Sequence, residues 1–563
     1  MVRSHLDWKR RPQAASDSAV AAVLEALGAS GSAPPASPVL AVFQDDRRPL
    51  SGDVQLEDGG RRLLRGELPA TLPPGYHRLG DRLLIVAPPA CPPAPRAWGW
   101  AVQLYSALSG ESAGIGDLGD LRRLARWSAE LGAEVLLLNP LHAPAPTKPQ
   151  QASPYFPSSR LYRNPLYLRV EGLAAERPPL IDRDQVFDQK LAALEREFVA
   201  FAGDPGFDAY RQREGGALAR FSRFCSDLDS RSAEFHAWLQ WRLDEQLGAA
   251  AGEIGLIHDL AIGVDPGGSD AAMWRDVLAP GVRIGAPPDE FNGAGQDWGM
   301  PPFDPWKLRA ARYEPFIRTL RAAFRHGRGV RIDHVMGLFR LWWIPPGAGP
   351  AGGAYVRYPW RDLLAIVALE AARAGAFVIG EDLGTVETWV RRELRRRGVL
   401  SCRVLWFESR RPARYPAAAM AAVSTHDLPT IAGLWTGRDL DLQREAGLEP
   451  NEAGTAEIRA RLRRLTRAAK DAPAGEVARR TYEELAAAPS LLLTATLEDA
   501  AGAFERPNLP GTVDGRNWSR PLPLTLEELE QAPLPRQIAA TLSRREPDTS
   551  RRERVGGKSR RRK

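Results

Sequence analysis

The chain has 563 residues, 44% of them hydrophobic and 16 of them tryptophan, so it can bury a large core and is not a disordered protein. Its cysteines, Cys91, Cys225 and Cys402, lie far apart, which argues against a disulfide framework or a cysteine zinc site. The formal net charge of +7 raises the question of a nucleic-acid partner, which the distribution of the charge must answer.

The N-terminal part of the chain predicts a small accessory module, residues 1–94. Its first residues are charged and lack the apolar core of a signal peptide. Residues 18–28 have the spacing of a short amphipathic helix, and from 38 to 88 short apolar runs alternate with Gly, Asp and Pro turns, as in a β-rich sandwich or partial sandwich. A proline-rich segment, 87–95, is typical of a stiff linker at a domain boundary.

Beyond the linker, eight short apolar runs recur, most of them separated by helical patterns. This alternation predicts an α/β fold, a (β/α)8 barrel over residues 95–542 with an inserted subdomain at about 140–250. The predicted strands are VQLY (102–105), EVLLL (134–138), IGLIHDL (254–260), GVRID (329–333), FVIGE (377–381), RVLWF (403–407), AAVST (421–425) and LLLTA (491–495). No stretch reaches the ~20 apolar residues of a membrane helix, so we expect a cytoplasmic protein with no membrane partner.

The last residues, 543–563, are polar and basic, and we expect this tail to be disordered. They contain 10 basic and 3 acidic residues, so the tail carries the whole charge excess and the rest of the chain is formally neutral. A basic-tailed nucleic-acid-binding protein is one hypothesis for such a chain. The neutral body argues against it, and we expect no nucleic-acid partner.

Three of the predicted barrel strands end in an acidic residue, at Asp333, Glu381 and Asp427. Because strand ends meet at one mouth of such a barrel, the three acids should converge there. Cleavage of a glycosidic bond needs a carboxylate and a carboxylic acid on either side of the bond, and this arrangement can supply both. Acids at strand ends also cap helices or pair with arginine, so any one of them alone favours a structural role.

Local chemistry suggests different roles for the acids. Arg331 and Asp333 lie two apart on a strand and face the same side, so the guanidinium favours an ionised carboxylate there. Glu381 follows an apolar strand, where burial near other acids would raise its pKa, as a general acid requires. Asp427 follows His426, and such a pair can hold sugar hydroxyl groups.

The sequence around these acids resembles the 4-α-glucanotransferases of the amylomaltase (disproportionating enzyme) type, glycoside hydrolase family 77, within the α-amylase clan. The resemblance covers roughly residues 38 to 530. The matching segments are GYHRL (75–79), QLYSALS (103–109), GIGDLGDL (114–121), NPLHA (139–143), SPYFPSSRLYRNPLYL (153–168), DLAIGVDPGGSD (259–270), GAPPDEFNGAGQDWGMPPF (285–303), GVRIDHVMGLFRLWWIP (329–345), VIGEDLGTV (378–386), STHDLPT (424–430) and RPNLPGTVDGRNWSRPLP (506–523).

The resemblance implies a role for each matched residue. Asp333 corresponds to the catalytic nucleophile, Glu381 to the general acid/base and Asp427 to the acid that stabilises the transition state. The segment 285–303 corresponds to a mobile loop over the acceptor side. The residues implied to bind substrate are Tyr155, Gln296, Trp298, Arg331, His334, His426 and Asn508.

The resemblance also implies the reaction and its partners. We expect transfer of α-1,4-linked glucosyl or maltooligosaccharide units to the 4-hydroxyl group of another glucan or of glucose, by a retaining mechanism without a cofactor or a catalytic metal. An α-glucan hydrolase would use the same three acids with water as acceptor. The Asp-rich stretch 259–270 leaves a structural Ca²⁺ open, and the oligomeric state is left undecided.

Overall fold

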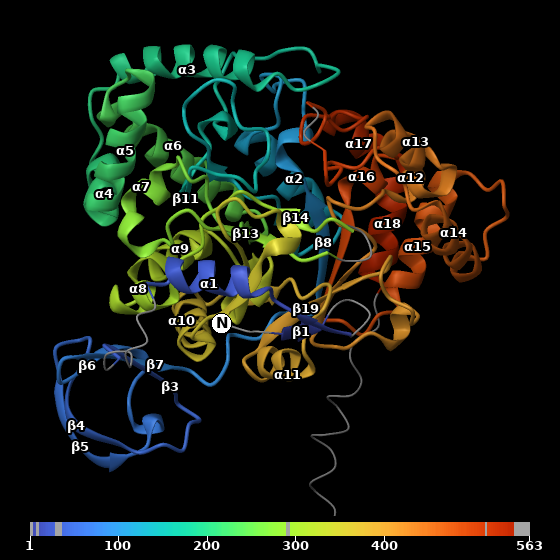
Figure 1. Ribbon diagram of the computed structural model, residues 1–563. Coiled ribbons are helices and arrows are strands. Elements are labelled where there is room, and N and C mark those ends of the chain that lie inside the picture. Colours follow the sequence, from blue (N-terminus) through green and yellow to red (C-terminus); the bar gives the residue numbers. More distant parts are fainter. Residues whose placement is uncertain (1–3, 7–10, 29–36, 289–292, 513–514, 545–563) are drawn as a thin grey trace, which may run out of the picture.

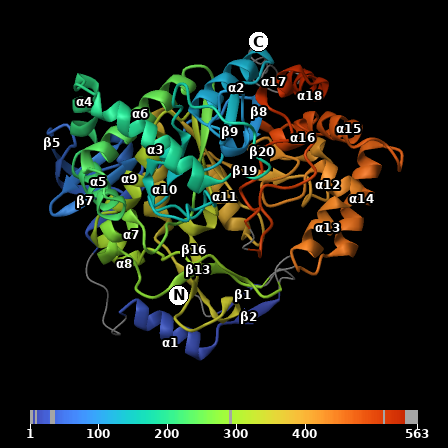
Figure 2. The ribbon, with the colours of Figure 1, turned by 90° about the horizontal axis from the view of Figure 1, so that it is seen from above.

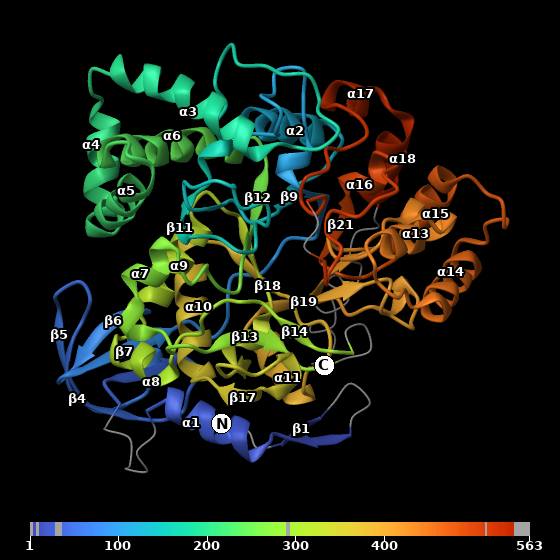
Figure 3. The ribbon, with the colours of Figure 1, turned by 45° about the horizontal axis from the view of Figure 1, so that its top comes forward.

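Eight parallel strands close into a barrel at the centre of the computed structural model, which describes residues 4–6, 11–28, 37–288, 293–512 and 515–544 (Figure 1, Figure 3). Each strand pairs with the next along the chain, and the last pairs with the first. The strands are β8 (Ala97–Val102), β9 (Val135–Leu138), β12 (Gly255–Leu260), β15 (Gly329–Ile332), β18 (Phe377–Gly380), β19 (Val399–Val404), β20 (Ala419–Ala422) and β21 (Leu492–Thr496). The predicted (β/α)8 fold is confirmed.

Three barrel strands begin earlier in the chain than the sequence predicted. The seventh, Ala419–Ala422 rather than 421–425, is displaced least, and the first and sixth are displaced most. The first strand covers Ala97–Val102 rather than 102–105, because the backbone turns after Gln103 and the Leu104 N–H leaves the ladder to donate to Asn139 Oδ1 at 2.7 Å. The sixth covers Val399–Val404 rather than 403–407, since the Phe407 N–H turns back to the Val404 carbonyl at 2.9 Å. Both predictions mistook the apolar turn after a strand for the strand itself.

Helices surround the barrel and begin and end at residues that favour helix termini. Asp117 caps α2 (Leu118–Glu130) in a capping box with Asp120, and α10 (Trp360–Ala374) ends at Gly375, which has a left-handed φ of 63°. Between β15 and β21 the outer layer is completed by α10, α11 (Thr388–Arg396), α12 (Ile431–Thr436), α13 (Arg438–Glu445), α14 (Glu452–Thr466) and α15 (Ala474–Ala486) (Figure 2). The last helices are α16 (Leu497–Ala500), α17 (Leu526–Gln531) and α18 (Pro533–Ser543).

A long segment between β9 and β12 forms a helical layer on one side of the barrel (Figure 1). It is tied down by the fully buried Lys190, whose ammonium group donates to the Leu166 and Leu168 carbonyls at 2.8 and 2.7 Å and lies 3.2 Å from Asp117. Its elements are β10 (His142–Ala143), β11 (Ser159–Arg163), α3 (Arg183–Val199), α4 (Pro205–Glu214), α5 (Gly216–Asp229) and α6 (Ala233–Ala251).

A second layer of strands covers the barrel beside β15. The four-stranded sheet has the order β14-β13-β16-β17, and it holds the described part of the segment 285–303, of which residues 289–292 lie outside the described residues. Its strands are β13 (Arg283–Ala286), β14 (Gln296–Asp297), β16 (Arg340–Ile344) and β17 (Ala354–Arg357), and the nearby helices are α7 (Ser269–Met273), α8 (Pro305–Ala310) and α9 (Glu314–Phe324).

The expected β-rich N-terminal module is confirmed, but its strands form a single five-stranded sheet instead of a sandwich. The order is β3-β7-β6-β4-β5. One face needs no second sheet, because Val39, Phe43 and Ile85 join the hydrophobic core around α10. The strands are β3 (Val39–Phe43), β4 (Leu50–Gln55), β5 (Arg61–Glu67), β6 (Gly75–Leu79) and β7 (Arg82–Ala87).

The chain ends differ in how far the structure describes them. At the N-terminus, α1 (Asp17–Ala26) lies against β17, and β1 (Ser4–Leu6) pairs with β2 (Pro12–Ala14) (Figure 2, Figure 3). The tail predicted to be disordered, 543–563, lies outside the described residues from 545 onward. None of the helices in the described part of the chain is both long and apolar enough to cross a membrane.

Candidate active site

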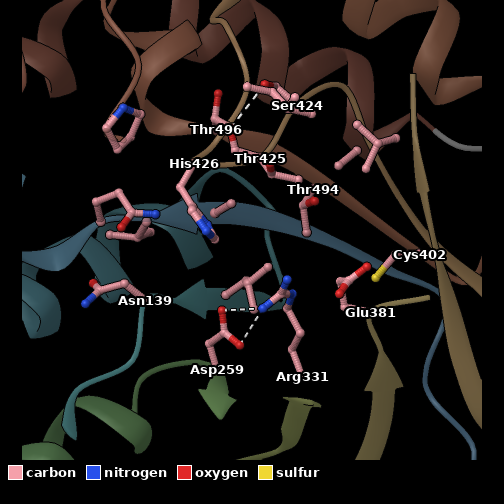
Figure 4. Close-up of a pocket in the computed structure, with 18 of the residues that line it drawn as sticks. Asn139, Asp259, Arg331, Glu381, Cys402, Ser424, Thr425, His426, Thr494 and Thr496 are labelled. Atoms are coloured by element: carbon pink, nitrogen blue, oxygen red, sulfur yellow. Dashed lines mark hydrogen bonds and ion pairs between the residues drawn. The ribbon is translucent and has the colours of Figure 1, made fainter. Parts of the chain in front are cut away.

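The three predicted acids lie at the same mouth of the barrel, each just beyond the carboxyl end of a strand. Asp333 follows β15, Glu381 follows β18, and Asp427 lies in the loop after β20. A cavity of about 800 Å³ opens there and is lined by Glu381, Arg331, Tyr155 and His426, among others (Figure 4). Asp333 and His334 line an adjoining cavity of about 890 Å³. Both hollows open to solvent at the barrel mouth, where a ligand can enter.

Arg331 holds Asp333 in place and is itself held by a residue that the sequence did not predict. One guanidinium nitrogen, Nη1, donates to both oxygens of Asp259 at 2.6 Å (Figure 4). The other, Nη2, lies 3.0 Å from Asp333 Oδ1. Asp259 and Arg331 are paired across β12 and β15 in the parallel register. The buried guanidinium thus links the two carboxyl groups and fixes the position of Asp333.

Glu381 is a carboxyl group whose pKa suits proton transfer near neutral pH. Its Oε2 accepts from the His334 backbone N–H at 3.1 Å and its Oε1 from that of Leu383 at 2.6 Å, which fixes its orientation. Burial, reinforced by the charge of Asp333, raises the pKa of Glu381 to about 7, although Arg331 opposes the shift. A pKa near the working pH lets one group both donate and accept a proton.

Asp427 is held in the opposite protonation state. Burial alone would raise its pKa, but the charge of His426 and hydrogen bonds from His426 and Asn508 lower the pKa below its usual value. Asn508 Nδ2 donates to Asp427 Oδ1 at 2.7 Å, and His426 Nε2 lies 3.3 Å from Oδ2. The site thus combines acids whose pKa values are pushed in different directions.

An aromatic group flanks these acids and includes a second residue that the sequence did not predict, Trp518. The ring of Tyr155 lies 4.7 Å from that of His426 and 5.5 Å from that of Trp518, between centroids. Tyr155 Oη donates to Asp259 Oδ2 at 2.6 Å and lies 3.2 Å from His426 Nδ1. Trp518 has a positive φ of 61°, a strained conformation that aims its ring at this cluster.

Gln296 and Trp298 lie on the far side of Asp333. Trp298 Nε1 donates to Gln296 Oε1 at 3.0 Å, so Gln296 orients the indole ring. The Trp298 ring stands edge-on to that of His334, 5.2 Å away between centroids. All ten predicted site residues therefore line or flank the barrel mouth, and Asp259 and Trp518 complete the set. The sequence held a signal for each: Asp259 is an acid at the end of a predicted strand, and Trp518 is the aromatic residue of the segment RNWSRP (516–521).

The acids of the stretch 259–270 are bound by protein groups. Asp259 pairs with Arg331, and Asp270 accepts from Ser159 Oγ at 2.6 Å and from the Arg160 backbone N–H at 2.8 Å. In the described ranges no three His, Cys, Asp or Glu side chains lie close enough together to hold a metal ion.

A parallel barrel whose mouth holds a glutamate of raised pKa beside an arginine-held aspartate is typical of enzymes that act on glycosidic bonds. The sequence matches the family described as 4-alpha-glucanotransferase over residues 102–230 and 226–525. The chain belongs to this family, and its activity is that of a 4-alpha-glucanotransferase acting on α-1,4-glucans.

Individual relatives agree with this placement. A 4-alpha-glucanotransferase of Mycobacterium bovis is 42% identical over 82% of this chain and 79% of its own length, and that of Haemophilus influenzae is 34% identical over 67% of each. The crystal structure of amylomaltase from Corynebacterium glutamicum superposes with a TM-score of 0.87 at 30% identity, covering 96% of this chain and 98% of its own. Amylomaltase from Streptococcus agalactiae shares the fold, with a TM-score of 0.65 at 19% identity over 80% of this chain and 98% of its own.

Proposed function

We propose that Asp333, Glu381 and Asp427 carry out a retaining transfer between α-1,4-glucans. The units transferred are glucosyl or maltooligosaccharide groups, and the acceptor is the 4-hydroxyl group of a second glucan, of a maltooligosaccharide or of glucose. The observation that carries the proposal is the contrast between a glutamate whose pKa is raised to about 7 and the ion pair of Arg331 with Asp333 beside it.

The reaction proceeds in two displacements. Asp333 attacks the anomeric carbon while Glu381 gives its proton to the departing glycosidic oxygen, which leaves as a free 4-hydroxyl group, and a covalent glycosyl-enzyme forms. Glu381, now a carboxylate, then takes the proton of the incoming 4-hydroxyl group, whose oxygen displaces Asp333. Asp427, ionised and held by Asn508, stabilises the positive charge that develops on the sugar ring in both transition states.

The substrate-binding residues divide between the two sides of these acids. The flat faces of Tyr155 and Trp298 suit the apolar faces of glucose rings, and His334, His426 and Asn508 present polar atoms beside them. Arg331 and Gln296 act by orienting their neighbours, Asp333 and Trp298. Transfer prevails over hydrolysis when water is kept from the glycosyl-enzyme, a role that fits the segment 285–303 around Trp298.

Incubation of the pure protein with maltotriose tests the proposal. Transfer yields glucose together with a ladder of longer maltooligosaccharides, because each glycosyl unit passes to another sugar. Glucose and maltose without longer products would identify the alternative, an α-glucan hydrolase that uses the same acids. A matched incubation in excess glucose should shift the ladder toward short products, since glucose then competes as acceptor.

A further inference from the structure

One wall of the barrel mouth carries polar groups that the proposed reaction does not use. Glu498 lies in α16, directly beyond β21, and Gln103 directly follows β8. Both side chains line the 800 Å³ cavity. In the closed order of strands, β21 lies opposite β15 and β8 lies opposite β18. Glu498 and Gln103 therefore stand on the wall that faces Arg331 and Glu381.

The two residues are buried without hydrogen-bond partners for one oxygen each. Glu498 is 7% exposed and Gln103 is 9% exposed, and neither Glu498 Oε1 nor Gln103 Oε1 has a partner among the described residues. An unpaired buried acceptor is destabilising. Both oxygens are shielded from the cavity that their side chains line, so a hydroxyl donor of a ligand would reach them only after the side chains turn.

Two neighbouring polar side chains, by contrast, are paired within the protein. Asp499, the next residue, accepts from the Ile431 backbone N–H at 2.8 Å and from Tyr482 Oη at 2.8 Å. Asn139, which also lines the cavity, accepts from the Leu104 backbone N–H at 2.7 Å.

The protonation state of Glu498 suits an uncharged partner. Burial raises the pKa of Glu498 to about 7, with a further contribution from Asp499 and an opposing one from His426. The carboxyl group is therefore largely neutral in weakly acidic solution and can both donate and accept hydrogen bonds. A sugar hydroxyl group, which also does both, is complementary to it.

We propose that Glu498 and Gln103 form a hydroxyl-binding wall that holds a glucosyl unit of the substrate from the side opposite the catalytic acids. This inference rests on the proposed function for the identity of the sugar. The two residues position the ring between themselves and the Arg331 side, and they select for the hydroxyl groups that reach them.

Binding measurements separate this role from catalysis. Asp333→Asn serves as the catalytically silent parent, and calorimetry gives the Kd of maltotriose for the parent and for the same protein carrying Glu498→Leu or Glu498→Gln. We expect Glu498→Leu to weaken binding roughly tenfold or more, because a hydrogen-bonding site is lost, and Glu498→Gln to stay within about threefold. Gln103→Leu should weaken binding in the same direction, which keeps the test open if Glu498→Leu fails to fold.

Asp499→Asn is the matched control, since it changes the adjacent buried acid that already has partners. It should lower the melting temperature and leave the Kd of maltotriose unchanged. Monodeoxy maltotrioses then locate the contact. One of them should bind the parent more weakly than maltotriose does, yet bind the Glu498→Leu protein as tightly as maltotriose binds that variant.

The outcomes are distinguishable. If the parent binds maltotriose and the Kd is unchanged in all Glu498 and Gln103 variants, this inference alone is overturned. The two side chains would then contact only water. A parent that does not bind maltotriose overturns the proposed function and this inference with it.

Discussion

At the scale of single residues, the active site depends on one guanidinium shared by two carboxylates. Arg331 is buried between Asp259 and Asp333, so its charge is used twice, once to fix its own position and once to hold the side chain that we propose as the nucleophile. A lysine could not replace it, because only the planar guanidinium group of arginine donates hydrogen bonds to two acids in fixed directions.

Replacing Asp333 by asparagine tests the nucleophile. The amide has nearly the same shape but cannot attack the anomeric carbon, so we expect transfer from maltotriose to fall by about four orders of magnitude or more. The melting temperature and circular dichroism of Asp333→Asn should stay near those of the wild type. Substantial residual transfer by a folded variant would contradict the assignment.

Glu381 should make the activity and the stability depend on pH in the same sense, because the protonated carboxyl group favours both. Its pKa is about 7 in the folded protein against an ordinary value of 4.5, so the folded state binds the proton more tightly than the unfolded state does. Its contribution therefore lowers the stability as the pH rises from about 4.5 to about 7, and the loss is complete above that range. The proton that costs stability when it leaves is the one that catalysis needs.

Glu381→Gln should accordingly be inactive but more stable than the wild type at pH 8, because the amide is never ionised. At pH 4.5 the two proteins should have nearly the same melting temperature, since Glu381 is then protonated. Melting curves at both pH values check this. An equal gap at the two pH values would show that the pKa of Glu381 is not raised by folding.

At the scale of elements, the sequence predicts the barrel because each strand is a short apolar run beside a helical pattern. The acids at the ends of β15 and β18 could be recognised for the same reason, since a charged residue ends each run. The other boundaries follow from long-range contacts, such as the bond from Leu104 to Asn139 that ends β8. Asp259 was overlooked as a site residue because its partner, Arg331, is close only once β12 and β15 pair.

The sandwich predicted for the N-terminal sheet was also wrong because the sequence does not reveal long-range contacts. The apolar residues of the N-terminal sheet do face a partner, but that partner is α10, which lies some 300 residues further along the chain. Alternating apolar residues in a strand show that one face is buried, without showing whether a helix or a sheet buries it. Trp518 likewise reaches the site through a backbone conformation with a positive φ, which the local sequence does not predict.

Arg397 links the N-terminal sheet to the barrel, and its removal should loosen that contact. The fully buried guanidinium lies over the Phe43 ring, 3.5 Å from its centroid, and Nη1 donates to Asp45 Oδ1 and to the Pro89 carbonyl, both at 2.8 Å. We expect Arg397→Ala to lower the free energy of unfolding by about 2 kcal/mol, because charged hydrogen bonds and the ring contact are lost together. Urea unfolding measures this change.

Arg396 provides the control for that variant. It pairs with the same acid, Asp45, also at 2.8 Å, but its side chain is 50% exposed. Arg396→Ala should therefore change the stability by only about 0.5 kcal/mol, as for an exposed ion pair. Equal losses from the two variants would show that burial of Arg397 contributes nothing to the linkage.

At the scale of the whole molecule, charge and chemistry are divided between two parts of the chain. The catalytic body has equal numbers of basic and acidic residues, whereas the terminal segment 543–563 carries the entire excess of +7. A neutral body suits an uncharged glucan, because no long-range field acts on such a substrate.

Deletion of residues 545–563 should therefore separate the two properties. We expect the shortened protein to keep the wild-type transfer rate with maltotriose and the wild-type melting temperature, since α18 still ends at Ser543 and packs through Ile538 and Leu542. Retention on a heparin column at low salt should fall to that of a neutral protein, because the attraction depends on the number of basic residues. If the shortened protein were retained as strongly as the intact chain, the basic surface would have to lie on the catalytic body, and the division of charge would fail.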